Sequence, residues 1–381
     1  TAQGNADGNG IGDFYYAPPS GFLALCTSNL PDPVATIDPN QGGSPQDYFN
    51  TVLYTGTGGT QSISVGFQPD FTWNKQRSGA DFHALQNSVA GPTKILVSNT
   101  NNAEATITDC LTAFTSTGFT LGADSSGFGN ENTATYASWN WKAGTAFSND
   151  ASSTSVGSID SAGSVNTDVG FSIIGYTGTG SNGTIAHGLG VTPEMYIVKR
   201  RDADGHSWPV YTSTLGATKQ LRLSGTNAEI TTANIWNNTE PTSSVFSVGT
   251  NTDSNASSGT YIAYFFASVD GYSKFGSYTG NGNADGSFVY TGFRPALVIF
   301  KRTSDTSNWN LRDSKRDPHN VTAQYLLADS SGAEGTTSSN LIDFTSNGFK
   351  TRGIGSASNA SGSTYIYMAF AEQPFKYANA R

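Results

Sequence analysis

Two short acidic segments hold the side chains whose spacing best fits a chemical role. In the first, Asp7, Asn9 and Asp13 alternate with glycines, and oxygen ligands wrapped around a glycine turn are what Ca²⁺ prefers. For a run that begins at Asn5, an EF-hand would need glutamate at the twelfth position, where Tyr16 stands. The three residues are therefore retained only as a candidate for a looser calcium loop. The run Gly-Asn-Ala-Asp-Gly at 4–8 recurs at 282–286, which favours a turn instead.

The second segment places Asp202 and Asp204 beside His206. Two carboxylates next to an imidazole could serve acid–base chemistry, but Asp-Gly is a turn dipeptide, and a polar hairpin tip is the favoured interpretation. The four histidines do not follow zinc-ligand spacing, and there is no G-x-S-x-G nucleophile motif. No catalytic residue, ligand-binding residue or cofactor is assigned from the sequence.

Glycines 178, 180 and 183 have the G-x-G-x-x-G spacing of a dinucleotide-binding loop. That loop must be followed by a helix, whose N-terminus holds the pyrophosphate. The following residues are rich in glycine and end in Pro193, so they cannot start a helix. The sequence predicts a glycine-rich hairpin turn here instead of a nucleotide site.

The same turn belongs to a set of four landmarks that recurs in order along the chain, which is typical of tandem modules. The landmarks are Tyr-Thr-Gly-x-Gly at 54–58, 176–180 and 278–282; a proline at 69, 193 and 295, followed by a strand that contains lysine; Ala-Glu at 103–104, 228–229 and 333–334; and Phe-Thr-Ser-x-Gly-Phe at 114–119 and 344–349, with a degenerate copy at 244–246. Each unit closes on a strand that begins at Tyr136, Tyr261 or Tyr365.

These short strands between turn clusters predict an all-β fold of three tandem β-sandwich modules, jelly-roll or concanavalin-like, of about a hundred residues each. The expected divisions are a connector at 1–33, modules at 34–147, 171–270 and 271–381, and a Ser/Gly-rich flexible linker or exposed insertion at 148–170.

Period-two alternation indicates which side chains form the core. Trp139 and Trp141 are expected to face inward, and so are Phe71 and Trp73, with Thr72 and Asn74 facing out. The matching strands of the second and third modules, at 195–200 and 297–302, are apolar on both faces. We expect a second cover there, for which a neighbouring subunit is one candidate.

Composition narrows the function classes. The net charge is −9 and only 13% of residues are charged, so a nucleic-acid partner is not expected, since phosphate binding needs clustered Lys and Arg. No stretch approaches the roughly 18 apolar residues of a membrane span, so membrane insertion is not expected.

Several segments of the chain are similar in sequence to one family of phage proteins. Residues 13–33, 165–171, 187–193 and 369–381 resemble the C-terminal part of large virion structural proteins, tail-fibre-like or appendage proteins, of marine tailed phages. The resemblance implies that a SPRY or concanavalin-like domain lies upstream, with residues 1–33 as its tail or a connector. It also implies a position on the outside of the particle.

The resulting hypothesis is a non-enzymatic phage tail fibre or surface appendage that contacts other virion proteins and a host-surface glycan. We expect a homo-oligomer, with a trimer as the first guess from the habit of fibres. Two alternatives stay open. A secreted carbohydrate-binding protein needs an exposed aromatic platform in some module, and a polysaccharide depolymerase needs two carboxylates roughly 5 to 10 Å apart in a groove.

Overall fold

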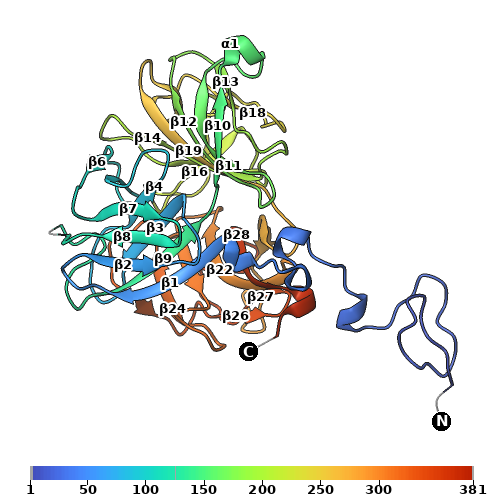
Figure 1. The fold of residues 1–381 in the computed structure, drawn as a ribbon. Coiled ribbons are helices and arrows are strands. Elements are labelled where there is room, and N and C mark those ends of the chain that lie inside the picture. Colours follow the sequence, from blue (N-terminus) through green and yellow to red (C-terminus); the bar gives the residue numbers. More distant parts are fainter. Residues whose placement is uncertain (1–2, 125, 380–381) are drawn as a thin grey trace.

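The computed structural model describes residues 3–124 and 126–379 and confirms the prediction of an all-β fold (Figure 1). Three large antiparallel sheets share one strand order, and each is accompanied by a small second sheet. We call these sheet pairs modules 1, 2 and 3. No helix in the described residues is long and apolar enough to cross a membrane.

Module 1 has a six-stranded sheet in the order β1-β9-β3-β4-β5-β6 and a small sheet in the order β2-β8-β7. Its strands are β1 (Phe49–Thr55), β2 (Gln61–Ser64), β3 (Phe71–Gln76), β4 (Ala84–Asn87), β5 (Lys94–Val97), β6 (Ala105–Thr106), β7 (Leu111–Thr115), β8 (Gly118–Leu121) and β9 (Thr135–Trp141).

In module 2 the order β12-β19-β14-β15-β16-β17 repeats that of the module 1 sheet, β10 and β11 extend one edge, and β13 pairs with β18. The elements are β10 (Thr145–Asn149), α1 (Ala151–Thr154), β11 (Ser161–Asn166), β12 (Phe171–Thr177), β13 (Gly183–Ala186), β14 (Met195–Arg200), β15 (Pro209–Thr212), β16 (Lys219–Arg222), β17 (Ile230–Thr231), β18 (Val245–Val248), α2 (Thr252–Asn255) and β19 (Thr260–Phe266).

Module 3 repeats the order again as β20-β28-β22-β23-β24-β25, with β21-β27-β26 as its small sheet. The strands are β20 (Ser273–Thr279), β21 (Phe288–Tyr290), β22 (Phe293–Arg302), β23 (Asn310–Asp313), β24 (Gln324–Leu327), β25 (Gly335–Thr336), β26 (Ile342–Thr345), β27 (Gly348–Thr351) and β28 (Thr364–Pro374). The remaining elements are the 3₁₀ turns η1 (Thr27–Asn29), η2 (Ala35–Ile37), η3 (Pro39–Gln41), η4 (Pro45–Asp47) and η5 (Phe375–Tyr377). The N-terminal residues form an arm that leaves the body (Figure 1).

The segment 148–170 differs from the expected flexible linker. Ser161–Asn166 form β11, which pairs along its whole length with β12, and β10 pairs with β11 in turn. Small side chains such as Gly163 fit here because a Cβ on that residue would meet the Ile173 carbonyl oxygen at 1.8 Å. A composition rich in Ser and Gly thus marks close strand packing at this edge, not a linker.

The Tyr-Thr-Gly-x-Gly turns lie at equivalent corners, but they are not hairpins as predicted. Each carries the chain from the large sheet to the small sheet of its module, as from β1 to β2 or from β12 to β13. A buried asparagine, Asn130, Asn255 or Asn359, clamps each corner. Asn255, for example, accepts from the backbone N–H of Thr179 at 2.8 Å and donates to the carbonyls of Ser181 and Gly249.

The two glycines that recur in all three corners have different roles. Gly58, Gly180 and Gly282 have positive φ, which glycine adopts without steric cost. Gly56, Gly178 and Gly280 do not; they allow close approach, since a Cβ there would meet a backbone oxygen at 2.2 to 2.4 Å. The preceding tyrosine stacks on the tyrosine that opens the closing strand, with ring centroids 4.9 to 5.1 Å apart in the three modules.

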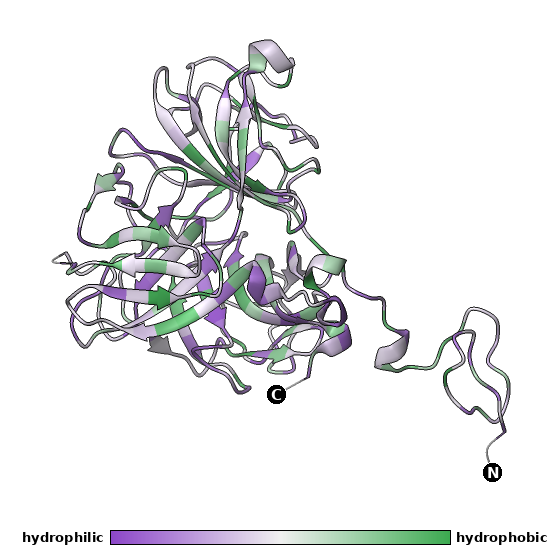
Figure 2. Cartoon of the chain, viewed as in Figure 1, coloured by the Kyte–Doolittle hydropathy of each residue, from purple (hydrophilic) through white to green (hydrophobic). Residues whose placement is uncertain are grey.

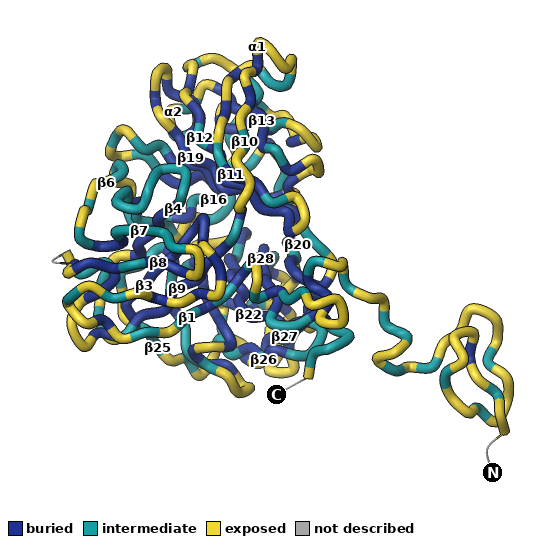
Figure 3. Tube along the Cα trace, in the orientation of Figure 1, coloured by how far each residue is buried: buried dark blue, intermediate teal, exposed yellow. Residues whose placement is uncertain are grey.

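The three modules share one core. A single cluster of buried side chains includes Phe71, Trp139 and Trp141 with Tyr264 and Phe370, so the predicted inward aromatics are confirmed as core residues. Rings from different modules touch: Phe71 and Tyr264 lie 4.5 Å apart, centroid to centroid. Figure 3 shows the buried residues concentrated where the modules meet, and Figure 2 shows apolar residues spread along the strands.

Each module also has its own cluster between its large and small sheets. This second layer covers the doubly apolar strands, so Tyr196 and Val198 are buried within the chain and need no neighbouring subunit. In module 1 the small sheet contributes apolar side chains to this layer, but the central strands of the large sheet present polar ones. Thr72 and Asn74 were expected to face out, but both are fully buried there, with Asn140 on the adjacent strand.

Candidate functional site

The structure uses the calcium candidates to fold the arm. Both oxygens of Asp7 accept hydrogen bonds, from the backbone N–H groups of Asn9, Ile11 and Ala24 and from the side chain of Asn29. These bonds, led by the one from Ala24, lower the pKa of Asp7 to about 2. Asp13 accepts separately from two backbone N–H groups near the N-terminus, and the Asn9 amide donates to Asn29. Asp7 and Asn9 thus both bond to Asn29, whereas Asp13 bonds to other partners, and all three side chains are engaged in hydrogen bonds within the arm.

The cluster predicted around Asp202 is also divided among different partners. Asp202 pairs with Arg200 at 2.9 Å, and Asp204 accepts from the backbone N–H of Ala103 in module 1 at 2.7 Å. His206 Nδ1 lies 2.9 Å from Asp253 Oδ1. The favoured interpretation of a polar tip fits these contacts, and the tip also touches module 1.

Ser207, Asp253 and His206 bring together the residue types of a hydrolytic triad. Here the serine hydroxyl donates to Asp253, and His206 Nε2 faces Arg200 Nη1 at 3.0 Å. A triad requires the imidazole to face the serine hydroxyl. In this arrangement the imidazole cannot accept the serine proton, and the cluster ties α2 to the end of β14.

The most regular polar contacts lie at the junctions between modules. The backbone N–H of Glu104 donates to the carbonyl of Arg201, that of Glu229 to Thr303, and that of Glu334 to Arg77, at 2.8 to 2.9 Å. The three glutamates belong to the Ala-Glu landmark of the repeat. The three accepting residues, Arg77, Arg201 and Thr303, each stand two positions after the lysine of the post-proline strand in their module. Module 1 thus contacts module 2, module 2 contacts module 3, and module 3 contacts module 1, which closes a ring.

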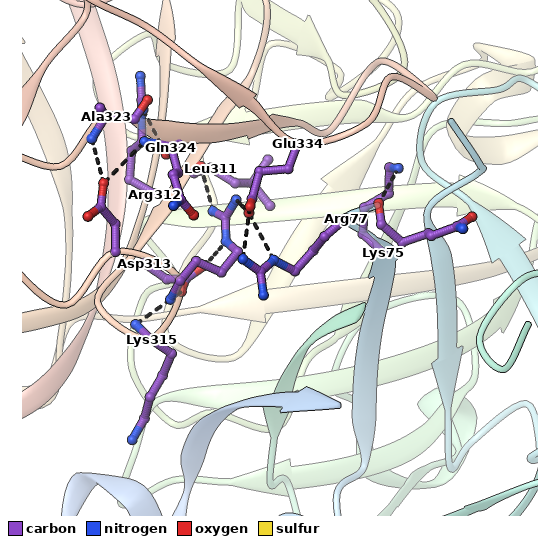
Figure 4. Close-up of polar contacts among 12 residues, drawn as sticks. Lys75, Arg77, Leu311, Arg312, Asp313, Lys315, Ala323, Gln324 and Glu334 are labelled. Carbon is purple, nitrogen blue, oxygen red and sulfur yellow. Dashed lines mark hydrogen bonds and ion pairs between the residues drawn. The ribbon is translucent and has the colours of Figure 1, made fainter. Parts of the chain in front are cut away.

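Side chains reinforce two of these junctions. Arg201 makes a two-pronged contact with Glu104 at 2.7 and 2.9 Å. Arg77 binds Glu334 in the same way at 3.0 and 2.9 Å, and Glu334 also accepts from Arg316 at 3.0 Å. Arg316 in turn pairs with Asp313 inside the protein, where both side chains are almost fully buried. Figure 4 shows Arg77 reaching across to Glu334 and the chain of contacts leading to Asp313.

A second set of equivalent contacts closes the same ring. The aromatic residue just before β4, β15 or β23 bonds to a backbone carbonyl of the preceding module in the ring: His83 Nε2 to Leu327, Trp208 Nε1 to Val97, and Trp309 Nε1 to Arg222. His83 accepts from Trp73 at its other nitrogen, and burial lowers its pKa to about 3. This histidine is therefore a neutral junction residue, not a proton carrier at neutral pH.

The repeated lysines 75, 199 and 301 end up inside the protein. Each is fully buried and donates to backbone carbonyls, and burial lowers the pKa of each to about 8. Lys301 also donates to the carbonyl of Thr226 in module 2. Each lysine sits on the strand whose end forms a junction.

One hollow of about 310 Å³ lies between residues 30–33 and module 3 and includes Tyr290. Two other hollows in the described part of the chain also have room for a ligand. An open groove of about 740 Å³ runs beside β11 and β12 of module 2 and contains Asp150, Asp160 and Arg201. Asp150 accepts from Ser152 and Ser153 at the start of α1, and these bonds hold its pKa below the usual range. Asp160 accepts from the backbone N–H of Ala151. A second, smaller pocket in module 3 contains the buried Arg312.

Sequence reasoning noted the Ala-Glu pairs and the lysines as landmarks but missed their role, and it missed Arg316, Asp313 and Arg312 altogether. One signal was available. The residues after each lysine, Gln-Arg, Arg-Arg and Arg-Thr, supply an arginine at the junction position in modules 1 and 2 but not in module 3.

The architecture defines an all-β protein in which three repeated two-sheet modules close around one core. A family model described as Domain of unknown function (DUF7483) matches residues 44–374, and the chain belongs to this family. The match spans all three modules, from just before β1 to the end of β28. No curated protein and no solved structure matches the chain.

Proposed function

We propose that this chain is a non-enzymatic structural component of a phage particle, a fibre or surface appendage that also adheres to host-surface glycan. The observation that carries the proposal is the ring of three junctions around a shared apolar core. A body closed in this way resists deformation because no module can swing away without exposing core surface and breaking two junctions. That property suits a spacer or a receptor-facing knob, and the resemblance to phage appendage proteins supplies the setting.

Adhesion is supported by a pair of aromatic side chains on the small sheet of module 3. Phe288 and Tyr290 alternate on β21, and both are exposed, at 48% and 59%. Residues two apart on a strand share one face, so the rings form the kind of platform on which sugar rings stack. Val289 between them is buried and anchors the strand.

Assembly into a homotrimer, with contacts to other virion proteins, stays part of the proposal, but its support changes. The doubly apolar strands no longer argue for a partner subunit, because the chain covers them itself. The remaining support is the exposed apolar set on the arm, which includes Tyr15, Tyr16, Phe22 and Leu25. Sedimentation equilibrium of the purified chain and of a variant lacking residues 1–33 tests this: a trimer that becomes a monomer without the arm is expected.

The direct test of the proposed function is to locate the chain on purified particles by cryo-electron microscopy. Density for the three-module body on the outside of the particle is the expected result. Particles with no such density, from a phage that encodes this chain, would contradict the structural role. For adhesion, the double variant Phe288→Ala/Tyr290→Ala should lose retention on host polysaccharide. Phe82→Ala, which removes a similarly exposed ring from module 1, is the control and should keep it.

A further inference from the structure

We propose that the hollow between residues 30–33 and module 3 binds one uncharged sugar unit of a glycan, and that Tyr290 provides its stacking surface. The inference rests on the adhesive part of the proposed function and names the class of sugar. The hollow has a volume of about 310 Å³, and Tyr290 is part of its wall. Small-molecule sites begin at about 300 Å³, so the space suits a single sugar unit.

Tyr290 belongs both to the exposed aromatic pair on β21 and to the wall of the hollow. It is 59% exposed, so its ring is open to a ligand. A Cβ on Gly292, which also lines the hollow, would lie 3.7 Å from the Tyr290 hydroxyl oxygen. The outer end of the ring therefore lies beside this glycine. Phe288 is exposed as well but stands outside the wall, so the aromatic pair leads from open surface into an enclosed space.

Hydrogen bonds fix the walls of the hollow relative to one another. Lys376 on η5 donates from Nζ to Asp32 Oδ1 at 2.6 Å and to the Leu30 carbonyl at 3.2 Å, which holds the base of the arm against the C-terminal segment. The backbone N–H of Phe375 donates to the carbonyl of Gly292 at 3.1 Å, which joins η5 to the turn after β21. Figure 1 shows the arm meeting the body beside the C-terminal segment. Walls held in this way lower the cost of ordering a ligand site.

The charged side chains in the wall balance one another, and two of them are uncommitted. The wall contains the carboxylates of Asp32 and Asp270 and the ammonium groups of Lys274 and Lys376. Asp32 and Lys376 form an ion pair. Within the described residues, Asp270 and Lys274 form neither an ion pair nor a side-chain hydrogen bond.

This balance favours a sugar without charge. An ammonium group only donates hydrogen bonds, a carboxylate only accepts them, and a sugar hydroxyl does both. Lys274 and Asp270 can therefore bind the hydroxyls of one sugar from opposite sides of the exchange. An anionic sugar would meet two carboxylates, and a cationic sugar two ammonium groups, with no net charge in the wall to offset the repulsion.

The position of Tyr290 is aromatic in module 3 alone. The registers of the small sheets place Ser64 of module 1 and Ala186 of module 2 at the equivalent position. The preceding residue is aliphatic and buried in all three modules, namely Ile63, Ile185 and Val289. The strand thus needs this buried residue for its core, whereas the fold accepts a small side chain at the position of Tyr290. Folding alone does not account for an exposed tyrosine there.

Ligand-observed NMR titration of the purified full chain tests the proposal. The uncharged probes are the methyl glycosides of glucose, galactose, mannose and N-acetylglucosamine, and the charged probes are sodium glucuronate and glucosamine. At least one uncharged glycoside should bind saturably, and the charged probes should bind about tenfold more weakly. Tyr290→Ser, which introduces the residue of module 1, should weaken this binding about tenfold. Phe288→Ser removes the ring outside the hollow and is the matched control, which should leave it unchanged.

Two further variants keep the ring and remove the uncommitted charges. Asp270→Ala and Lys274→Met should each weaken binding of the same glycoside about tenfold, whereas Asp305→Asn, which changes an exposed carboxylate of module 3 outside the hollow, should not. Thermal unfolding of each variant checks that it is folded.

The proposal is overturned if no uncharged glycoside binds or if the charged probes bind equally well. It is also overturned if Tyr290→Ser binds as the unmodified chain does, if Phe288→Ser loses as much binding as Tyr290→Ser, or if neither Asp270→Ala nor Lys274→Met weakens binding. Because the probes are small sugars and the chain is free in solution, a failure here leaves the position on a phage particle and the retention on host polysaccharide to their own experiments.

Discussion

The junction between modules 1 and 3 and the junction between modules 2 and 3 use the same backbone hydrogen bond but different side chains. At the first, Glu334 binds Arg77 and Arg316, and Arg316 extends the network to the buried Asp313. At the second, Thr303 stands where the other modules have arginine, and Glu229 pairs with Lys219 of its own module. The backbone bond therefore suffices to define the contact, while the ion pairs make its strength uneven around the ring.

The largest effect is expected from Asp313→Asn. Arg316 would then remain buried without its partner, and Trp139 would lose the anionic acceptor of its Nε1–H, which lies 3.2 Å away. Removing one side of a buried ion pair costs about 3–5 kcal/mol. Denaturant unfolding measures the change. Asp305→Asn, which breaks an exposed pair with Arg302, is the control and should cost less than about 0.5 kcal/mol.

The corner asparagines sharpen the comparison because their contacts are the same in all three modules. Asn130→Ala, Asn255→Ala and Asn359→Ala each remove about three hydrogen bonds to a buried turn. At about 1 kcal/mol for each bond, each variant should lose about 2–3 kcal/mol of unfolding free energy. Losses that differ widely among the three would show that the corners are not equivalent.

The junction glutamates should show a gradient instead. Glu334→Gln loses contacts with two arginines, and we expect about 2–3 kcal/mol. Glu104→Gln loses one two-pronged contact, for about 1–2 kcal/mol, and Glu229→Gln loses a half-exposed pair with Lys219, for less than about 1 kcal/mol. Equal losses in the three variants, measured under the same denaturant conditions, would contradict the proposed difference between junctions.

The smallest effect concerns the arm, which depends on one carboxylate instead of a shared core. The pKa of Asp7 falls from 3.8 to about 2 on folding of the loop, so its contribution is complete above about pH 4 and is lost as the pH falls toward 2. Amide NMR of Ile11 and Ala24 should report this loss while the body stays folded. In Asp7→Asn these amides should show no such transition.

The sequence was informative wherever one residue type has one physical role. Alternating aromatics predicted the core positions of Trp139 and Trp141, and repeated landmarks predicted equivalent corners. It was uninformative where the partner comes from another module. Nothing near Glu104 in the chain indicates that it meets Arg201, and the burial of Thr72 and Asn74 depends on a small sheet whose strands come from elsewhere in the module.

Local composition also misled in two places. The Ser- and Gly-rich segment around Gly163 forms β11, which is paired on both sides by β10 and β12, and only a small residue fits at Gly163 against Ile173. The glycine-rich corners cross between sheets because a buried asparagine replaces the hydrogen bonds that a hairpin partner would provide. In both cases tertiary packing decided between structures that composition left equally open.

Calorimetric unfolding of the full chain most directly tests the claim that three modules form one body around a shared core. The account predicts a single transition at neutral pH, with the calorimetric enthalpy equal to the van't Hoff enthalpy. Asp313→Asn should shift that transition as a whole. Separate transitions for individual modules, with Asp313→Asn lowering only one of them, would contradict the account.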